Sequence, residues 1–226
     1  MNYLAEFDPR QCGGHELRYA RSLEWLEPLL LPGAVVYDFG RGSYGGSTGL
    51  YGSGAEEWPF NAAVRRLFPV TLHSTGAADL RYPLLLPDAA CDGVLAMETV
   101  EHMKDREEDV DTFRYSGVRN LLAEAFRLLR PGGWLFLTTP NGSQYGCAWR
   151  LLCGHSALWG LDHVREFGYC EIQQFVRDAG FTIERGDALD VWEKLECPPI
   201  LSNLMDQLRP DLPRGDCTFL VARKPQ

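Results

Sequence analysis

The sequence predicts an α/β protein whose mainly parallel sheet is covered by helices on both faces. Three observations lead to this prediction. Strand-like apolar runs alternate with helix-like segments along the 226 residues, as in strands joined by crossover helices. The first of these runs, 34–39, contains Asp38 and passes directly into a glycine-rich turn, where an open α/β sheet commonly binds its ligand. The composition, 45% hydrophobic, is sufficient for the interior that such a sheet needs.

The first half of the chain predicts two helices and two strands. Residues 15–31 carry apolar side chains at helical spacing and stop at Pro32-Gly33, so a helix is expected before the strand at 34–39. Residues 59–67 begin with a proline, which is favoured in the first turn of a helix, and they are expected to form the second helix. The apolar segment 70–75 is the next predicted strand.

The second half continues the alternation. Residues 93–97 predict a buried strand, and 115–129 an amphipathic helix. Residues 134–139 are rich in side chains that favour β structure and predict a further strand, and 170–179 predict the last helix. An antiparallel pair of strands at the edge of the sheet completes the prediction, at 181–184 and 218–222.

The segment 141–163 is aromatic and polar and shows little periodicity of either kind. Segments of this length without regular structure are usually functional in compact domains, so we predict a lid over a ligand site. Its aromatic residues suit a ring or a sugar better than a polymer. The alternative is a helical cover over one face of the sheet.

Charge and cysteine content restrict the partners and the compartment. The chain has 22 basic and 31 acidic residues and a net charge of −9, which disfavours nucleic acid because affinity for phosphate backbones comes largely from lysine and arginine. A small-molecule substrate is therefore expected. Seven cysteines without a C-x-x-C pair indicate reduced thiols and a cytoplasmic location. We expect no leader peptide and no membrane-spanning segment.

The turn after the first strand, VVYDFGRGSYGG at 35–46, does not match the dinucleotide-binding pattern G-x-G-x-x-G. Asp38, Gly40 and Gly42 instead resemble the first motif, D-x-G-x-G-x-G, of the class I S-adenosylmethionine-dependent methyltransferases. Glycines in such a turn let backbone N–H groups approach a ligand closely. The resemblance implies that Asp38, Gly40, Gly42 and Ser43 bind the cofactor.

Later segments extend this resemblance at the expected distances. Asp79-Leu80 and the prolines and acids after it are similar to the family segment D-L-x-x-x-P-x-x-D, whose first acid or its neighbour lies beside the adenine. Residues 97–103, METVEHM, are similar to the E-x-L-E-H segment that ends the fourth strand. Residues 121–133, LLAEAFRLLRPGG, resemble the L-x-E-x-x-R-x-L-x-P-G-G connection into the fifth strand. The resemblance implies that Asp79, Leu80 and Glu98 complete the cofactor site.

The resemblance covers residues 15–185 and implies a Rossmann-like, mainly parallel sheet of seven strands in a single domain over 1–226, with 1–32 as a leading helical segment. In its details the chain is similar to type 11 and type 23 bacterial methyltransferases, many of them assigned to hydroxyl groups of sugars and secondary metabolites. We therefore expect O-methylation of a small-molecule hydroxyl, with S-adenosylmethionine as cofactor and S-adenosylhomocysteine as product. An N-methyltransferase would carry the same cofactor motifs.

The expected ribose contact departs from the family pattern, in which the second strand ends in an acid that accepts both ribose hydroxyls. Two alternatives stay open. In one, Glu56 or Glu57 ends a degraded strand. In the other, 70–75 is the second strand and Ser74 or Thr75 takes the place of the acid.

Candidate catalytic residues follow the fourth and fifth strands. Glu98, Glu101 and His102 form E-x-x-E-H and would share one face of a helical turn. His163 follows the predicted lid. Without a metal, His163 is the candidate general base that removes the proton of the acceptor hydroxyl, with His102 and Glu101 beside it.

The same residues give a metal-assisted alternative. E-x-x-E-H with a later histidine is similar to the RNA 3′-terminal 2′-O-methyltransferases and to the ubiquinone-biosynthesis O-methyltransferases. That resemblance implies Mg²⁺ at Glu98, Glu101, His102 and His163, where a metal lowers the pKa of the acceptor hydroxyl. Many relatives with this segment use no metal, so the sequence favours a site without one.

Alternatives from other classes remain. The lack of a clear acid to bind the ribose hydroxyls favours one of them, a non-catalytic protein that binds the cofactor and acts as a scaffold subunit. A nicotinamide-dependent oxidoreductase is disfavoured by the glycine spacing and by the lack of a Tyr-x-x-x-Lys pair. An RNA acceptor is disfavoured by the charge. A small-molecule acceptor is therefore the expected partner, and a homodimer is an open alternative for the assembly.

Overall fold

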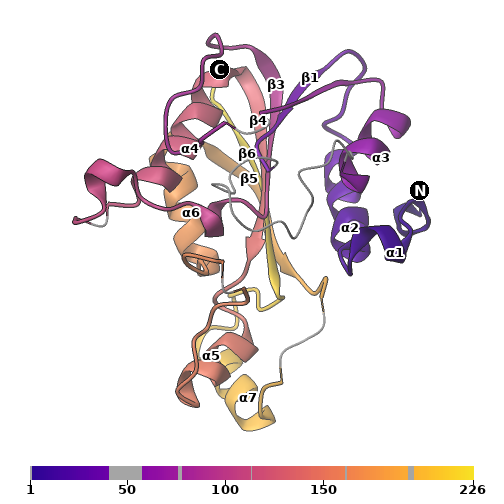
Figure 1. Ribbon diagram of the computed structural model, residues 1–226. Helices are drawn as coiled ribbons and strands as arrows, with labels where there is room; N and C mark the ends of the chain where they lie inside the picture. The colour runs from indigo at the N-terminus through magenta and orange to yellow at the C-terminus, as the bar shows by residue number, and fades with distance from the viewer. Residues whose placement is uncertain (1, 41–57, 76–77, 113, 161, 193–195) are drawn as a thin grey trace.

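Six strands form one sheet at the centre of the molecule (Figure 1). The computed structural model describes residues 2–40, 58–75, 78–112, 114–160, 162–192 and 196–226. The strands pair in the order β2-β1-β3-β4-β6-β5. Their bounds are β1 Val35–Asp38, β2 Thr71–Ser74, β3 Cys91–Met97, β4 Leu129–Pro140, β5 Thr182–Leu189 and β6 Cys217–Arg223. The prediction of seven strands is therefore corrected to six for the described residues.

The pairing agrees with the predicted mainly parallel sheet. β1 is parallel to both β2 and β3, and β3 is parallel to β4. β6 runs antiparallel between β4 and β5. The antiparallel pair predicted at the edge is confirmed, because β5 stands last in the strand order and pairs antiparallel with β6. The carboxyl ends of β1, β3 and β4 consequently meet at one edge of the sheet, where ligands bind in open α/β folds.

Helices cover both faces of the sheet, as predicted (Figure 1). α2 and α3 pack on one face and α4 and α6 on the other. The alternation of side chains along β3 explains the two cores: Leu95 and Met97 face α2 and α3, whereas Val94 and Ala96 face α4 and α6. The bounds are α2 Glu16–Leu26, α3 Pro59–Leu67, α4 Ser116–Leu128 and α6 Tyr169–Asp178. Short helical segments are η1 Tyr3–Glu6, α1 Pro9–Cys12, η2 Val100–His102 and η3 Glu107–Asp109.

Two further helices lie together beyond the carboxyl end of the sheet (Figure 1). α5, Tyr145–Leu152, follows β4, and α7, Pro199–Leu208, follows β5. The hydroxyl of Tyr145 donates to Asp206 Oδ1 over 2.6 Å and ties the two helices to each other. The predicted lid segment is thus partly helical, and α7 was not predicted.

The second strand of the sheet is β2, the segment predicted at 70–75, since its residues pair in register with those of β1. This supports the second of the two ribose alternatives, in which Ser74 stands at the strand end. Glu56, Glu57, Gly42 and Ser43 lie outside the described residues. Across the described residues, each helix is too short or too polar to cross a lipid bilayer.

Candidate functional site

Asp38 and Gly40 shape the turn at the end of β1. Asp38 is buried, and its Oδ1 accepts a 2.8 Å hydrogen bond from the backbone N–H of Gly40. Its Oδ2 accepts from Asn61 Nδ2 at 2.7 Å, which connects the turn to α3. A Cβ at Gly40 would lie 3.1 Å from the carbonyl oxygen of Met97, a tight contact, so glycine suits the close approach of this turn to the end of β3. Asp38 therefore fixes the backbone on which a cofactor would rest.

The neighbouring strand end carries hydroxyl groups in place of an acid. Thr75 follows β2, and its backbone N–H and its hydroxyl donate to the carbonyl oxygen of Asp38 at 3.0 and 3.3 Å. Ser74 is the last residue of the strand. Among the described residues, no carboxylate ends β2, which is the departure that the sequence predicted.

Asp79 and Leu80 lie apart from the cavity described below. Asp79 accepts hydrogen bonds from the backbone N–H and the guanidinium of Arg81, which hold the pKa of its carboxyl below the usual value. Leu80 is buried among the side chains between the sheet and α4, and its carbonyl oxygen accepts from Asn120 Nδ2 at 3.0 Å. Their expected adenine role stays a prediction.

A cavity of about 450 Å³ lies at the carboxyl edge of the sheet, between α2 and the segment that follows α5. Its wall combines aromatic rings with ionisable groups. The tryptophan rings of Trp159 and Trp192 face each other at 5.6 Å between centroids, and Trp192 Nε1 donates to His15 Nδ1 at 3.2 Å. The other lining residues are Gln11, Cys12, Arg18, Tyr19, Trp58, Pro59, Glu98, Glu101, His102, Pro140, Gly160, Asp162 and His163.

Arg18 of α2 and Glu98 at the end of β3 form one polar part of this wall. Glu98 has a left-handed backbone (φ 49°), which turns its side chain back toward β4, where Thr138 Oγ1 donates to Glu98 Oε1 at 2.8 Å. Arg18 Nη1 lies 3.6 Å from the same oxygen. Arg18 is 1% exposed, and its Nε and Nη1 have no hydrogen-bond acceptor among the residues that the structure describes. A buried guanidinium with unused donors favours an anionic ligand.

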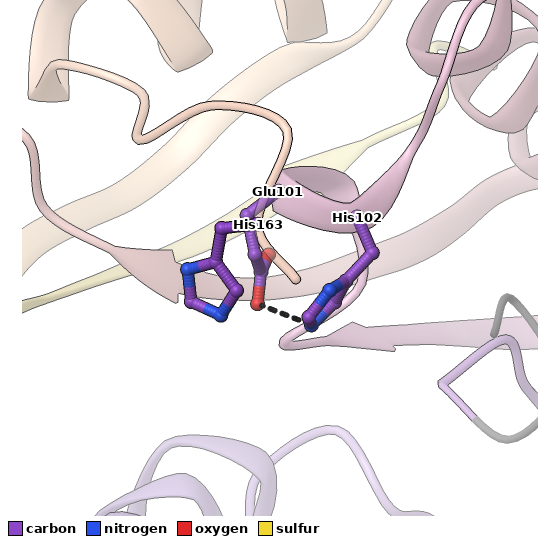
Figure 2. A group of neighbouring side chains, drawn as sticks. All are labelled: Glu101, His102 and His163. Atoms are coloured by element: carbon purple, nitrogen blue, oxygen red, sulfur yellow. Dashed lines mark ion pairs between the residues drawn. The ribbon is translucent and has the colours of Figure 1, made fainter. Parts of the chain in front are cut away.

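Glu101, His102 and His163 converge in another part of the wall (Figure 2). One ligand atom of each lies within 4.8 Å of those of the other two. The backbone brings them together: the carbonyl oxygen of Glu101, on η2, accepts from the N–H of Val164 at 2.7 Å. The rings of His102 and His163 meet edge to face, with centroids 4.6 Å apart.

Burial controls the charges in this group. Glu101 is fully buried; burial and the nearby charge of Glu98 raise the pKa of its carboxyl well above the usual value. Its Oε2 accepts from Thr139 Oγ1 at 2.9 Å. Within the described part of the chain, its Oε1 has no hydrogen-bond partner, and it lies 3.7 Å from His102 Nε2. Burial and the charge of His163 lower the pKa of His102.

The set of four predicted metal ligands is corrected to three within the described residues, because Glu98 is not part of the group. Arg18 and Thr138 hold its carboxylate elsewhere. Two imidazoles and one carboxylate are donors typical of Zn²⁺, Fe²⁺ or Mn²⁺, whereas Mg²⁺ prefers oxygen ligands. The unpartnered Glu101 Oε1 fits a bound cation, so the residues are compatible with a transition-metal ion and disfavour magnesium.

Glu166 orients His163 and was not predicted. Its Oε1 lies 2.6 Å from His163 Nδ1 and also accepts from the backbone N–H of Trp159 at 2.6 Å. The Glu166 side chain is 2% exposed. Burial is the largest single influence on the pKa of His163 and lowers it, but the hydrogen bond to Glu166 and the charges of Glu166, Asp162 and Glu98 together outweigh it, and the net shift is upward. The pattern H-x-x-E at 163–166 was the available sequence signal.

Two comparisons by sequence place these observations among known proteins. Residues 22–185 match the family model described as a methyltransferase domain. A probable S-adenosylmethionine-dependent methyltransferase of Mycolicibacterium smegmatis is 31% identical over 132 residues, which are 58% of this chain and 42% of that protein. The chain thus spans about two fifths of that relative. A ubiquinone biosynthesis O-methyltransferase of Burkholderia pseudomallei is 27% identical over 190 residues, 78% of this chain and 75% of that protein.

Solved structures share the fold. A methyltransferase of Archaeoglobus fulgidus that depends on S-adenosylmethionine has a TM-score of 0.60 at 14% identity, with 98% of this chain and 100% of that chain covered. A putative sarcosine dimethylglycine methyltransferase of Galdieria sulphuraria has a TM-score of 0.56 at 12% identity, with 98% and 90% covered. At these identities the likeness supports the fold alone.

Proposed function

This chain belongs to the S-adenosylmethionine-dependent methyltransferase family, and from that premise we propose that it transfers a methyl group to a hydroxyl oxygen of a small molecule. One observation carries the choice of a hydroxyl acceptor: the imidazole of His163, oriented by Glu166, lines the cavity. A hydroxyl must lose its proton during the transfer, and an oriented imidazole is suited to accept it. The name of the Burkholderia relative points the same way.

The cofactor would lie between the turn after β1 and the Arg18–Glu98 pair. The amino-acid end of S-adenosylmethionine carries a carboxylate and an ammonium group. Arg18 offers unused donors for the carboxylate, and Glu98, 13% exposed, offers an acceptor for the ammonium. Asp38 and Gly40 would support the cofactor from the turn, together with Gly42 and Ser43, whose roles stay predictions.

The proposed chemistry needs one nucleophile and one proton acceptor. The hydroxyl oxygen of the acceptor attacks the methyl carbon of the sulfonium, so the O–C bond forms as the C–S bond breaks and the electron pair stays on sulfur. The hydroxyl proton passes to Nε2 of His163. Glu166 stabilises the resulting imidazolium through Nδ1, as a buried carboxylate 2.6 Å away can do. The products are the methyl ether and S-adenosylhomocysteine.

A metal ion is a second route to the same hydroxyl, favoured by the convergence of Glu101, His102 and His163. These three residues would hold the ion, and a bound ion would lower the pKa of the acceptor hydroxyl. The two routes differ in one measurable respect: activity that survives dialysis against a strong chelator supports His163 as the base, whereas activity lost there and restored by Zn²⁺ or Mn²⁺ supports the metal.

The first experiment is calorimetric titration of the protein with S-adenosylmethionine and S-adenosylhomocysteine, followed by transfer of a labelled methyl group to a panel of phenols, sugars and amines. Binding with transfer to a hydroxyl compound supports the proposal. Transfer to amines alone would identify an N-methyltransferase. Tight cofactor binding without transfer to any acceptor would favour the non-catalytic scaffold, and the absence of cofactor binding would contradict the proposed site.

A further inference from the structure

A buried carboxylate, that of Asp216, holds the short segment that carries Trp192 into the wall of the cavity. Asp216 is the residue before β6 and is 2% exposed. Its Oδ1 accepts from the backbone N–H of Val191 and its Oδ2 from that of Trp192, both at 2.9 Å. The pairing of β5 with β6 ends at Leu189 and Cys217, so these two N–H groups lie beyond it. The carboxylate therefore binds them in place of a partner strand.

Asp216 is itself fixed to the end of β4. Its carbonyl oxygen accepts from the backbone N–H of Asn141 at 2.8 Å, and Asn141 Nδ2 donates to the carbonyl oxygen of Gly215 at 2.9 Å. Burial raises the pKa of the Asp216 carboxyl to about 6, with smaller contributions from the charges of Asp190 and Glu98, although the two backbone donors lower it. At neutral pH the side chain is thus ionised, and both of its oxygens accept hydrogen bonds.

Trp192 in turn connects two sides of the cavity. Its Nε1 donates to His15 Nδ1 at 3.2 Å, at the start of α2, and its ring lies 5.6 Å from that of Trp159, in the segment that follows α5. Cζ of Arg18 lies 5.9 Å from the ring centroid of Trp192 and 4.9 Å from that of Tyr19, within the range of cation–π attraction. The indole therefore stands beside the guanidinium that is proposed to bind the carboxylate of the cofactor.

We propose that Asp216 is a positioning residue for the cofactor, because it keeps the indole of Trp192 against the Arg18 guanidinium and so fixes the orientation of that guanidinium. This inference rests on the proposed cofactor site. A long side chain that its neighbours already hold in place loses less conformational entropy when a ligand binds. Without the Asp216 carboxylate, the backbone at Trp192 is held less firmly and the indole can move away from Arg18. The amino-acid end of the cofactor is then bound more weakly.

Calorimetric titration with S-adenosylhomocysteine and with 5′-methylthioadenosine, which has no carboxylate, tests this role. Asp216→Asn replaces one acceptor oxygen with an amide that donates, and we expect it to weaken S-adenosylhomocysteine binding roughly three- to tenfold. Binding of 5′-methylthioadenosine should change little, which also shows that the variant is folded. The control is Asp211→Asn, an exposed aspartate of the same segment that pairs with Arg209, and it should leave both affinities unchanged.

A double-mutant cycle tests whether the carboxylate acts through the indole. Trp192→Ala should weaken S-adenosylhomocysteine binding at least as much as Asp216→Asn does, and the double variant should bind no more weakly than Trp192→Ala alone. Fluorescence gives a readout without any ligand, because the difference between the wild type and Trp192→Phe isolates the emission of Trp192. The same difference measured in the Asp216→Asn background should lie at longer wavelength, as expected of an indole that is more exposed to water.

Three results would overturn the inference while leaving the proposed function intact. They are an unchanged affinity of Asp216→Asn for S-adenosylhomocysteine, an equal loss for both ligands, which would indicate a structural role only, and additive losses in the double variant. Absence of S-adenosylhomocysteine binding by the wild type would contradict the proposed function itself, and the inference would fall with it.

Discussion

His163 is the residue on which the proposed chemistry depends most directly. We predict that His163→Ala lowers the rate of methyl transfer by roughly 10²-fold or more, the usual contribution of a general base. Glu166→Gln should lower the maximal rate less, since the amide oxygen can still accept from Nδ1 but does not stabilise the imidazolium. His155→Ala, an exposed histidine on the same segment, is the matched control. Initial rates with labelled cofactor measure the three effects.

A rate for His163→Ala close to that of His155→Ala would remove His163 from the proton transfer. An unchanged Michaelis constant for the cofactor in Glu166→Gln separates orientation of the base from damage to the cofactor site. Loss of cofactor binding in that variant would instead indicate a structural role for the carboxylate.

Arg18 gives a second prediction at this scale. Replacement by methionine should weaken S-adenosylhomocysteine binding by roughly 10- to 100-fold, the loss of one or two charge-assisted hydrogen bonds. Binding of 5′-methylthioadenosine, which has no carboxylate, should change little. The control is Arg21→Met, an exposed arginine on the same helix that pairs with Glu24. Calorimetry measures all four affinities, and an equal loss for both ligands would contradict a carboxylate contact.

Among the elements, α2 is joined to the far side of the cavity through His15 and Trp192. Burial and the charge of Arg18 lower the pKa of His15 to about 4. Its pKa in the unfolded chain is near the ordinary value of 6.5, so the contribution of neutral His15 to stability is complete above pH 6.5 and is lost as the pH falls from 6.5 through 4. We predict a loss on the order of 2–3 kcal/mol over this range.

Thermal unfolding between pH 7 and pH 4 checks this prediction, with His15→Gln as the comparison because glutamine can still accept from Trp192 but does not titrate. The variant should lose less stability on acidification than the wild type. Identical pH dependence of the two proteins would show that His15 does not titrate differently on folding.

The elements that were predicted correctly can be recognised from their own short stretch of sequence. Pro59 at the first helical position and the apolar face after it defined α3 at both ends. α7 begins at Pro199, in a pair of prolines that is typical of a loop, and it was missed although Ile200, Leu204 and Leu208 recur at helical spacing. The strand predicted at 70–75 is β2, and its pairing with β1 was a question of sheet order that local sequence does not answer.

For the molecule as a whole, the sequence identified the residues after β3 but not those that complete the site from elsewhere. Glu101 and His102 are adjacent, and His163 follows the predicted lid after the fifth strand, so their convergence was expected. Arg18 lies in a helix recognised by its apolar face, where an arginine is ordinarily solvated; its burial arises only when β3 and β6 pack beside it. Glu98 was placed with the metal ligands because spacing alone does not reveal that Arg18 and Thr138 hold it.

The position of β6 has a consequence for how the protein matures. This strand, Cys217–Arg223, is the most C-terminal of the six, yet it lies between β4 and β5 and is the only strand paired with β5 in the described structure. Its Cys217 Sγ also lies 3.6 Å from Glu98 Oε1, beside Arg18. A nascent chain still lacking these residues therefore has no partner strand for β5 and lacks the contact of Cys217 with Glu98. We therefore expect the growing chain to bind the cofactor only after this strand has left the ribosome, that is, after synthesis has passed Arg223.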